Sequence, residues 1–245
     1  MDHVLTEHGL RLTYLRNPHA IDELGQDRIL DDLADDTADG NPLPWLTRYR
    51  LTDYDHLVLV ADRSSGRYLG FLAASNGATT REDFLLLETA FVTTVARGQN
   101  LMRRMIALAM LRIGGMGPVP SVIAASTRNP HCCRIMRDIA RRFTNAAFFP
   151  NPDSVAINFH TATLAQRIVR EIGPNYRLQA STGTIRGPAA AISGGFHRQL
   201  STDPQIDSLF SQRMQPARRM LAILDLRRGD EATILDDARR LYRSK

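Results

Sequence analysis

Three apolar segments follow one another closely in the first half of the chain, and they constrain its fold more than any other feature. The segments are residues 56–62, 67–75 and 83–92, and the turn-rich sequences RSSG and NGATTRE separate them. Short apolar runs bounded by turn residues are typical of β-strands. The spacing therefore predicts three consecutive strands connected as a meander.

Helices and strands are also predicted on both sides of this meander. Hydrophobic periodicity predicts a strand at residues 10–16, a helix within the acidic segment 17–40, an amphipathic helix at 100–115 and a strand at 120–127. Asn129 and Pro130 suit the N-cap and first position of a further helix that runs to about residue 143. The acidic side of the helix within residues 17–40 indicates a solvated face, or a surface for a cationic partner.

The composition is that of a soluble globular protein. Hydrophobic residues make up 43% of the 245 residues, and no apolar run approaches the roughly 18 residues of a membrane span. The first residues carry acids and do not resemble a signal peptide. Two cysteines, Cys132 and Cys133, are adjacent and unsuited to pairing with each other, which indicates a reducing compartment. We therefore expect a cytoplasmic protein.

Arginine supplies nearly all of the positive charge, because Lys245 is the only lysine in a chain of net charge +5. Either genome composition explains this usage, or guanidinium groups bind anionic ligands in a bidentate manner. A nucleic-acid contact is disfavoured, since acidic residues are interleaved with the arginines of the C-terminal region and no reader motif is present.

The last third of the chain is predicted to be mostly helical. Helical patterns cover residues 161–173, 206–214, 217–229 and 230–243, whereas residues 180–195 favour a loop or a strand pair. We expect one domain over residues 1–200 and a helical C-terminal extension over residues 201–245. The extension either docks on the domain or acts as an arm in a homodimer, and a regulatory partner surface is the alternative.

An Arg-Gly turn separates the third strand of the meander from the amphipathic helix that follows it. The backbone N–H groups at a helix N-terminus lack intrahelical partners and lie at the positive end of the helix dipole. A loop that leads into such a helix is therefore suited to binding an anion. Gly98 allows a phosphate to approach the backbone without obstruction by a side chain.

The sequence VTTVARGQNLM, residues 92–102, has the spacing of a known motif, V-x-P-x-x-R-G-x-G-x-G. Val92, Arg97 and Gly98 are in register with it, and Leu101 matches its usual aliphatic residue. In these positions the chain resembles the GNAT superfamily of acyl-CoA-dependent N-acyltransferases. The likeness covers about residues 12–143, a little over half of the chain.

The chain also departs from the family pattern. Asn100 and Met102 stand where the motif has glycines; asparagine tolerates a left-handed backbone, whereas the larger Met102 narrows the site. In the helix at residues 129–143, Asn129 and Cys132 match the family, but Met136 occupies the position of a tyrosine that commonly protonates the departing thiolate. Methionine cannot donate this proton.

The resemblance implies an α/β (α+β) fold with a central mixed, mostly antiparallel sheet flanked by helices. It implies acetyl-CoA or another acyl-CoA as donor, and an amine of a small molecule or an amino acid as acceptor. Residues that the resemblance assigns to donor binding are Phe91, Val92, Thr93, Arg97, Gly98, Gln99, Asn100, Leu101, Met102 and Asn129.

Glu88 and Cys132 are the candidate catalytic residues. Glu88 lies four residues before Val92, and so on the same strand face. Several relatives use a carboxylate in this neighbourhood as the base; the alternative is a half-exposed strand carboxylate paired with an arginine. Cys132 lies near a helix N-terminus, where a thiol pKa can be lowered, and is a candidate proton donor; the alternative is a small core residue. No metal site is expected, since His131 has no second ligand at metal spacing.

The sequence thus predicts an N-acyltransferase that moves an acetyl or other acyl group from acyl-CoA to an amine. Two alternatives stay open. One is a catalytically impaired protein of the same fold that binds acyl-CoA or acts as a scaffold, which Met136 favours. The other is an N-acyl amino acid synthase that takes its acyl group from a carrier protein.

Overall fold

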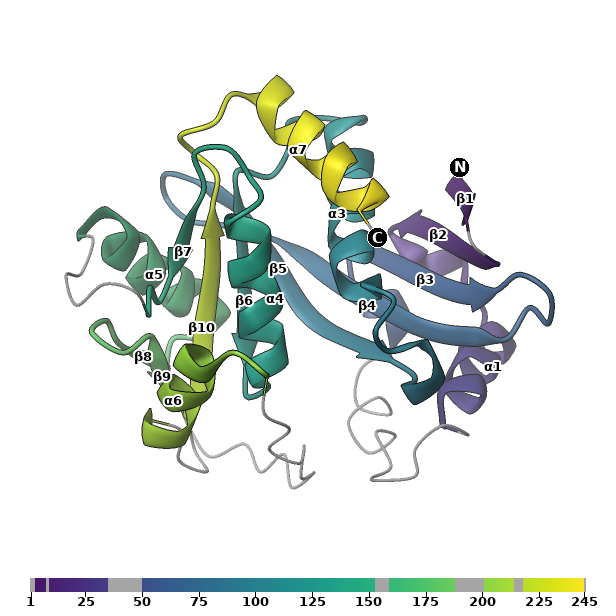
Figure 1. Ribbon diagram of the computed structural model, residues 1–245, viewed down its shortest axis with the longest axis horizontal. Helices are drawn as coiled ribbons and strands as arrows, with labels where there is room; N and C mark the ends of the chain where they lie inside the picture. Colours follow the sequence, from purple (N-terminus) through teal and green to yellow (C-terminus); the bar gives the residue numbers. More distant parts are fainter. Residues whose placement is uncertain are drawn as a thin grey trace. The chain divides into compact units, whose positions relative to one another are not determined.

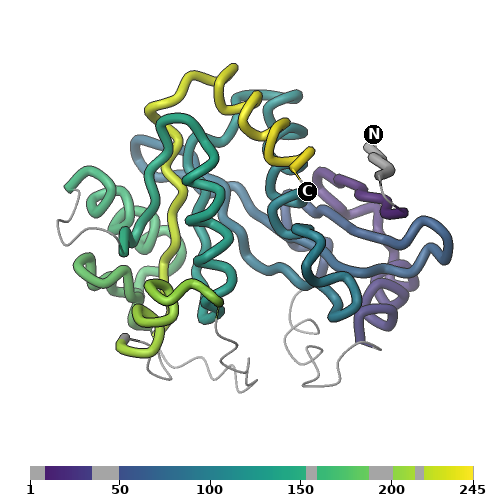
Figure 2. Tube along the Cα trace, in the orientation of Figure 1, coloured from purple at the N-terminus to yellow at the C-terminus, as the bar shows by residue number. Residues whose placement is uncertain are grey.

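The structure, a computed structural model, divides into two compact units along the chain. It describes residues 3–7, 9–34, 50–152, 159–187, 201–213 and 218–244. Unit 1 comprises Met1–Ser75, Leu87–Val119 and Ala238–Lys245, and unit 2 comprises Asn76–Leu86 and Pro120–Asp237. Strand β5 (Asp83–Val92) and helix α7 (Glu231–Arg243) therefore contribute residues to both units. The path of the chain can be followed in Figures 1 and 2.

Unit 1 contains the predicted meander. Its strands are β1 (His3–Glu7), β2 (Leu10–Arg16), β3 (His56–Asp62), most of β4 (Tyr68–Ala78) and the second half of β5, and they are neighbours in that order. The pairings of β1 with β2, β2 with β3, and β3 with β4 are antiparallel. The three strands predicted at residues 56–92 are confirmed.

Two helices cover the sheet of unit 1. Helix α1 (Glu23–Ala34) buries Ile29 and Leu33, one helical turn apart, in a cluster with Leu57 and Phe71. Helix α3 (Leu101–Gly114) is almost wholly buried along Met105–Met110 and contacts β2 and β3. Because alternate residues of a strand point to opposite faces, β3 needs an apolar layer on each side, and nearly all of its residues are buried. The rest of the acidic segment, residues 35–40, lies outside the described residues.

A buried hydrogen bond between Tyr14 and His56 joins β2 to β3, with 2.8 Å between Oη and Nδ1. Burial raises the pKa of Tyr14 to about 12, against a small lowering by Arg16. The unfolded chain ionises Tyr14 near pH 10 while the folded chain keeps it neutral, so the contribution of Tyr14 to stability is constant below pH 10 and is lost between about pH 10 and 12. This raised pKa corresponds to roughly 3 kcal/mol of stability.

We expect this loss to disappear in Tyr14→Phe. Urea unfolding at pH 9 and at pH 11.5 measures it, as the difference between the wild type and the variant. At pH 9 the variant should be about 1 kcal/mol less stable than the wild type, because it lacks the hydrogen bond to His56. At pH 11.5 this deficit should shrink or reverse, because only the wild type has lost the contribution of Tyr14. If the two proteins lost the same stability between pH 9 and pH 11.5, the pKa of Tyr14 would be the same in the folded and the unfolded chain.

Unit 2 is built on strand β10 (Arg218–Asp225). This strand pairs antiparallel with β6 (Val122–Thr127) on one side, and with β9 (Thr184–Arg186) and β7 (Ala147–Phe149) on the other. Strand β8 (Arg177–Gln179) pairs with β9. The segment predicted as a loop or a strand pair, residues 180–195, therefore contains one strand in its described part, and the partner of that strand precedes the segment. The first half of β5 is the neighbour of β6.

The predicted helix over residues 217–229 is wrong, because β10 occupies this segment. Residues 220–226 are all buried, and β10 lies inside the sheet of unit 2 with neighbours on both sides. A strand that is buried on both faces shows a continuous apolar run, which hydrophobic periodicity alone does not distinguish from a buried helix. The residues from 218 to 225 are therefore part of a sheet and not of a helical extension. The boundary proposed at residue 200 lies outside the described residues.

Four helices accompany this sheet. They are α4 (Pro130–Ala140), α5 (Phe159–Ile172), α6 (Pro204–Arg213) and the first half of α7. Leu164, Ile168 and Val169 of α5 pack on Val122 and Ile223 in an apolar cluster. Arg137 of α4 is buried and donates to Asp203 at 2.7 Å and to Gln205, which joins α4 to α6. A mixed, mostly antiparallel sheet flanked by helices, as the sequence predicted, is confirmed.

In the described part of the chain, every helix is too short or too polar to cross a bilayer.

Candidate donor-binding loop

The loop between β5 and α3 lies entirely in unit 1. Thr93 fixes its start, because both the backbone N–H and the hydroxyl of this buried residue donate to the carbonyl oxygen of Leu69, at 2.9 and 3.0 Å. A short 3-10 turn, Thr94–Ala96, follows and buries Ala96. Residues 97–99 are exposed. The loop is thus anchored at the strand and open to solvent before the helix.

Two residues of the loop adopt left-handed backbone conformations. Gly98 has φ 85° and Asn100, the N-cap of α3, has φ 56° and ψ 23°. The expectation that Asn100 takes the backbone conformation of a glycine is therefore confirmed. A Cβ atom placed on Gly98 meets no atom within 4 Å, so the space beside the backbone is open.

The N-terminus of α3 has no side-chain cap. The amide oxygen of Asn100 accepts instead from Arg103 Nη1 at 2.8 Å. Among the described residues, no hydrogen-bond partner is seen for the backbone N–H groups of Gly98, Gln99, Leu101 and Met102. A helix of 14 residues therefore presents unpaired donors and its positive dipole end beside an open loop.

The end of β5 lies very close to β4. A Cβ atom on Gly70 would stand 2.6 Å from the carbonyl oxygen of Phe91 and 3.3 Å from Cα of Val92. Only glycine fits such a close approach of two backbones. Arg97 Nε donates to the carbonyl oxygen of Val92 at 3.4 Å, which folds this exposed side chain back toward the strand. Phe91 and Val92 are themselves half-buried.

Glu88 is exposed on β5, four residues before Val92. The alternation of side chains along a strand places both residues on the same face. The structure thus gathers the candidate base, the strand end and the loop in unit 1.

Asn129 and Cys132 belong to unit 2. Asn129 caps α4, since its side-chain oxygen accepts from the backbone N–H of His131 at 2.9 Å, and the predicted N-cap is confirmed. Burial raises the pKa of Cys132 to about 11, although a hydrogen bond with Thr127 lowers it. The lowered pKa that a helix N-terminus can produce is therefore not found at Cys132, because burial outweighs the hydrogen bond with Thr127. Met136 is fully buried in the apolar face of α4.

A pocket in unit 2 was not predicted from the sequence. It has a volume of about 250 Å³ and is lined by Ala147, His160, Thr161, Asp225, Arg227 and Arg228. Arg227 donates to Asp225 and, across 145 positions of sequence, to Glu82. No local pattern reveals such distant partners. Within the described ranges, no cluster of histidine, cysteine and acidic side chains is suited to a metal ion.

The fold is similar to solved structures of acetyltransferases at low sequence identity. A scan of family models and a search of curated proteins found no match. Diaminobutyrate acetyltransferase EctA from Paenibacillus lautus, in complex with L-2,4-diaminobutyric acid and coenzyme A, is 13% identical; 89% of this chain and 97% of that chain are covered, with a TM-score of 0.41. The ribosomal-protein-S5-alanine acetyltransferase from Vibrio fischeri is 12% identical over 56% and 81% of the two chains, with a TM-score of 0.38.

A third solved structure is the GNAT family N-acetyltransferase YhbS from Escherichia coli in complex with CoA. It is 17% identical over 54% of this chain and 71% of that chain, with a TM-score of 0.32. At these identities, what this chain does has to be inferred from its own residues. YhbS is described as a GNAT-family N-acetyltransferase, and the motif at residues 92–102 resembles that superfamily.

Proposed function

We propose that the protein is an N-acyltransferase that moves an acetyl or other acyl group from acyl-CoA to the amine of a small molecule or amino acid. The observation that carries this proposal is the loop before α3, where Gly98 and Asn100 are left-handed and the helix N-terminus has no side-chain cap. Unpaired N–H donors at the positive end of a helix suit the pyrophosphate of coenzyme A.

Each part of the loop has a role in this proposal. The backbone of residues 98–102 holds the pyrophosphate, and Arg97 supplies an exposed guanidinium beside it. The main chain of residues 91–93 orients the pantetheine and the thioester. Asn129 is the N-cap of α4 in unit 2. A direct contact between Asn129 and the donor is proposed because the family motif has an asparagine at this position.

Acyl transfer to an amine needs a neutral amine and a stable leaving group. We assign Glu88 as the base that removes a proton from the amine, directly or through water. Cys132 is a poor proton donor, because burial raises its pKa to about 11 and makes it a weaker acid than an ordinary cysteine, whose pKa is about 8.5. The thiolate therefore leaves with little help from Cys132 and takes its proton from solvent.

One observation favours a second candidate function. Met136, at the position where the family commonly has a tyrosine acid, is completely buried and cannot transfer a proton. A protein that binds acyl-CoA without using it would keep the loop and lack this acid. Binding of the donor without release of free thiol, across a panel of amines and amino acids, would support this candidate over the enzyme.

Two substitutions at Asn100 test the loop without changing its backbone. Asn100→Asp keeps the size of the side chain and the contact with Arg103, but adds a negative charge where the pyrophosphate is proposed to bind. A like charge at about 5 Å costs roughly 1 to 3 kcal/mol, so we expect acetyl-CoA to bind about 5- to 150-fold more weakly. Isothermal titration calorimetry measures the two dissociation constants.

Asn100→Gly is the matched control. Glycine adopts the left-handed conformation readily, so the backbone donors stay in place and acetyl-CoA should bind with nearly the wild-type affinity. Equal affinities of the aspartate and glycine variants would refute pyrophosphate binding at this loop. Absence of donor binding by the wild type would refute the acyl-CoA proposal itself and leave a carrier-protein-dependent enzyme or a scaffold.

A further inference from the structure

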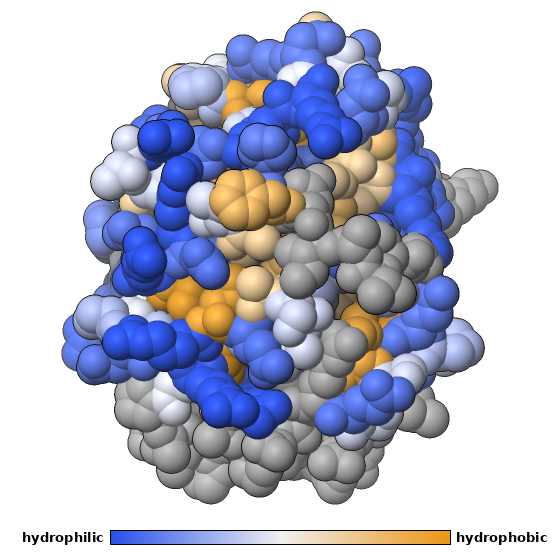
Figure 3. All heavy atoms as spheres, turned by 90° about the vertical axis from the view of Figure 1, so that its left-hand side faces the viewer, coloured by the Kyte–Doolittle hydropathy of each residue, from blue (hydrophilic) through white to orange (hydrophobic). Residues whose placement is uncertain are grey.

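The pocket of unit 2 lies at the end of β10, where two consecutive arginines follow the strand. Arg227 and Arg228 both line it, together with the start of α5. Figure 3 faces the part of Figure 1 where α5 and β7 are drawn, and it shows hydrophilic residues surrounding a smaller apolar area. Neither the proposed acyl transfer nor the donor-binding loop uses any residue of this pocket.

Arg227 is held rigidly in the pocket wall. Its Nε and Nη2 atoms donate to the two carboxylate oxygens of Asp225 at 2.9 and 2.7 Å, and its Nη1 atom donates to Glu82. These bonds fix the plane of the guanidinium and engage three of its five N–H groups. The other two N–H groups are left for a ligand, and they need no reorganisation to bind it.

The N-terminus of α5 forms another part of the wall. His160 and Thr161 are the second and third residues of this helix of 14 residues. Its first turn contains no acidic residue, although carboxylates are favoured at that position in helices. The positive end of the helix dipole is thus not compensated by an acid of the first turn.

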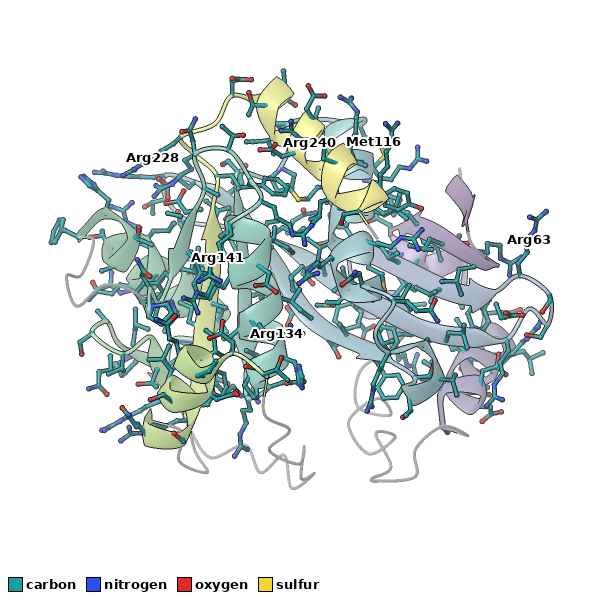
Figure 4. The ribbon with its side chains drawn as sticks, viewed as in Figure 1. Arg63, Met116, Arg134, Arg141, Arg228 and Arg240 are labelled. Atoms are coloured by element: carbon teal, nitrogen blue, oxygen red, sulfur yellow. The ribbon has the colours of Figure 1, made fainter. Side chains whose placement is uncertain are left out.

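Two guanidinium groups and two carboxylates surround the pocket. Asp225 and Glu82 both bind Arg227, so their negative charge is directed to that guanidinium. Arg228 is exposed, and Figure 4 shows it extending from the chain beyond β10. With Arg228 included, the two guanidinium groups balance the two carboxylates in formal charge, and both carboxylates pair with Arg227. Arg228 and the positive end of the α5 dipole are therefore the parts of the pocket left to meet an anion.

We propose that this pocket binds the carboxylate or phosphate group of a small anionic metabolite, with Arg228 and the two remaining N–H groups of Arg227 as donors. Arginine pairs and helix N-termini both suit these oxyanions, since their donors match the oxygens in geometry and charge. A volume of about 250 Å³ is below the roughly 300–1,000 Å³ of sites for drug-sized ligands, so the ligand is compact.

Residue-resolved NMR of the full chain tests the proposal with inorganic phosphate and, separately, with acetate. We expect saturable shifts of the backbone amides of His160, Thr161 and Arg228. Tighter binding of phosphate assigns a phosphoryl ligand, and tighter binding of acetate assigns a carboxylate. Shifts confined to Gly98 and Asn100, or no saturable shift up to about 10 mM, would overturn the proposal.

Arg228→Ala should raise the dissociation constant about tenfold or more, because a charge-assisted hydrogen bond is lost. Arg228 is exposed, so this variant should fold. Arg63→Ala, which removes another exposed arginine that lies in unit 1 and is labelled in Figure 4, is the matched control and should leave the constant unchanged. If both substitutions raised the dissociation constant equally, the anion would be attracted only by the overall positive charge of the protein. That result would refute a specific site. The signals of Gly98 and Asn100 report separately on the proposed acyl-CoA loop.

Discussion

Gly70→Ala should destabilise unit 1 by about 3 kcal/mol and weaken acetyl-CoA binding at the same time. The new methyl group would stand 2.6 Å from the carbonyl oxygen of Phe91, and that oxygen belongs to the backbone and cannot rotate away. Relief therefore requires β4 and the end of β5 to separate. Such a separation moves Val92 and disturbs the strand end that leads into the donor-binding loop.

Gly117→Ala is the control for this prediction. A Cβ atom on Gly117 meets nothing within 4 Å, so alanine should change stability by less than about 0.5 kcal/mol. Hydrogen exchange of the β4 and β5 amides reports on unit 1 specifically, which matters because two compact units need not unfold in one transition. Unchanged exchange in Gly70→Ala would mean that the two strands adjust without cost.

Glu88→Gln should lower kcat/KM for acyl transfer by about a hundredfold to ten-thousandfold, if Glu88 is the base that we propose. Glutamine has nearly the same size but cannot accept the proton of the amine. Because Glu88 is exposed on β5, the substitution should cost little stability. The affinity for acetyl-CoA should stay close to that of the wild type, since the donor is proposed to bind at the loop.

Release of free coenzyme A over a range of amine concentrations, at saturating acetyl-CoA, measures kcat/KM for the amine. Asp83→Asn provides the matched control, because Asp83 is an exposed carboxylate at the other end of the same strand. Its loss should leave kcat/KM unchanged. Equal activity of Glu88→Gln and the wild type would show that Glu88 is a surface carboxylate, the alternative that the sequence also allowed.

The sequence predicted those parts of the fold that depend on contacts between residues close together in the chain. Asn129 with Pro130 predicted the start of α4, and the N-cap hydrogen bond to His131 accounts for that success. The left-handed conformation of Asn100 followed from the tolerance of asparagine for this backbone region. In both cases the determining contacts lie within a few residues of sequence.

The failures arise where distant residues decide the outcome. Residues 218–225 were predicted as a helix, and only the partners of β10 on both sides make them a strand. The pKa of Cys132 is set by its burial, which the position of the residue in its helix does not reveal. The unit 2 pocket depends on the contact of Arg227 with Glu82, and no single stretch of sequence contains both residues.

Strand β10 also sets an order of events when the chain is made. Strand β6 ends at Thr127, and β10, which pairs with it along six residues, begins only at Arg218. A nascent chain must therefore carry the apolar edge of β6 unpaired while all the intervening residues are translated. Unpaired apolar strand edges join edges of other chains. The pairing of β6 with β10 can therefore form only after Arg218–Asp225 has been translated, and until then the edge of Val122–Thr127 is accessible to chaperones.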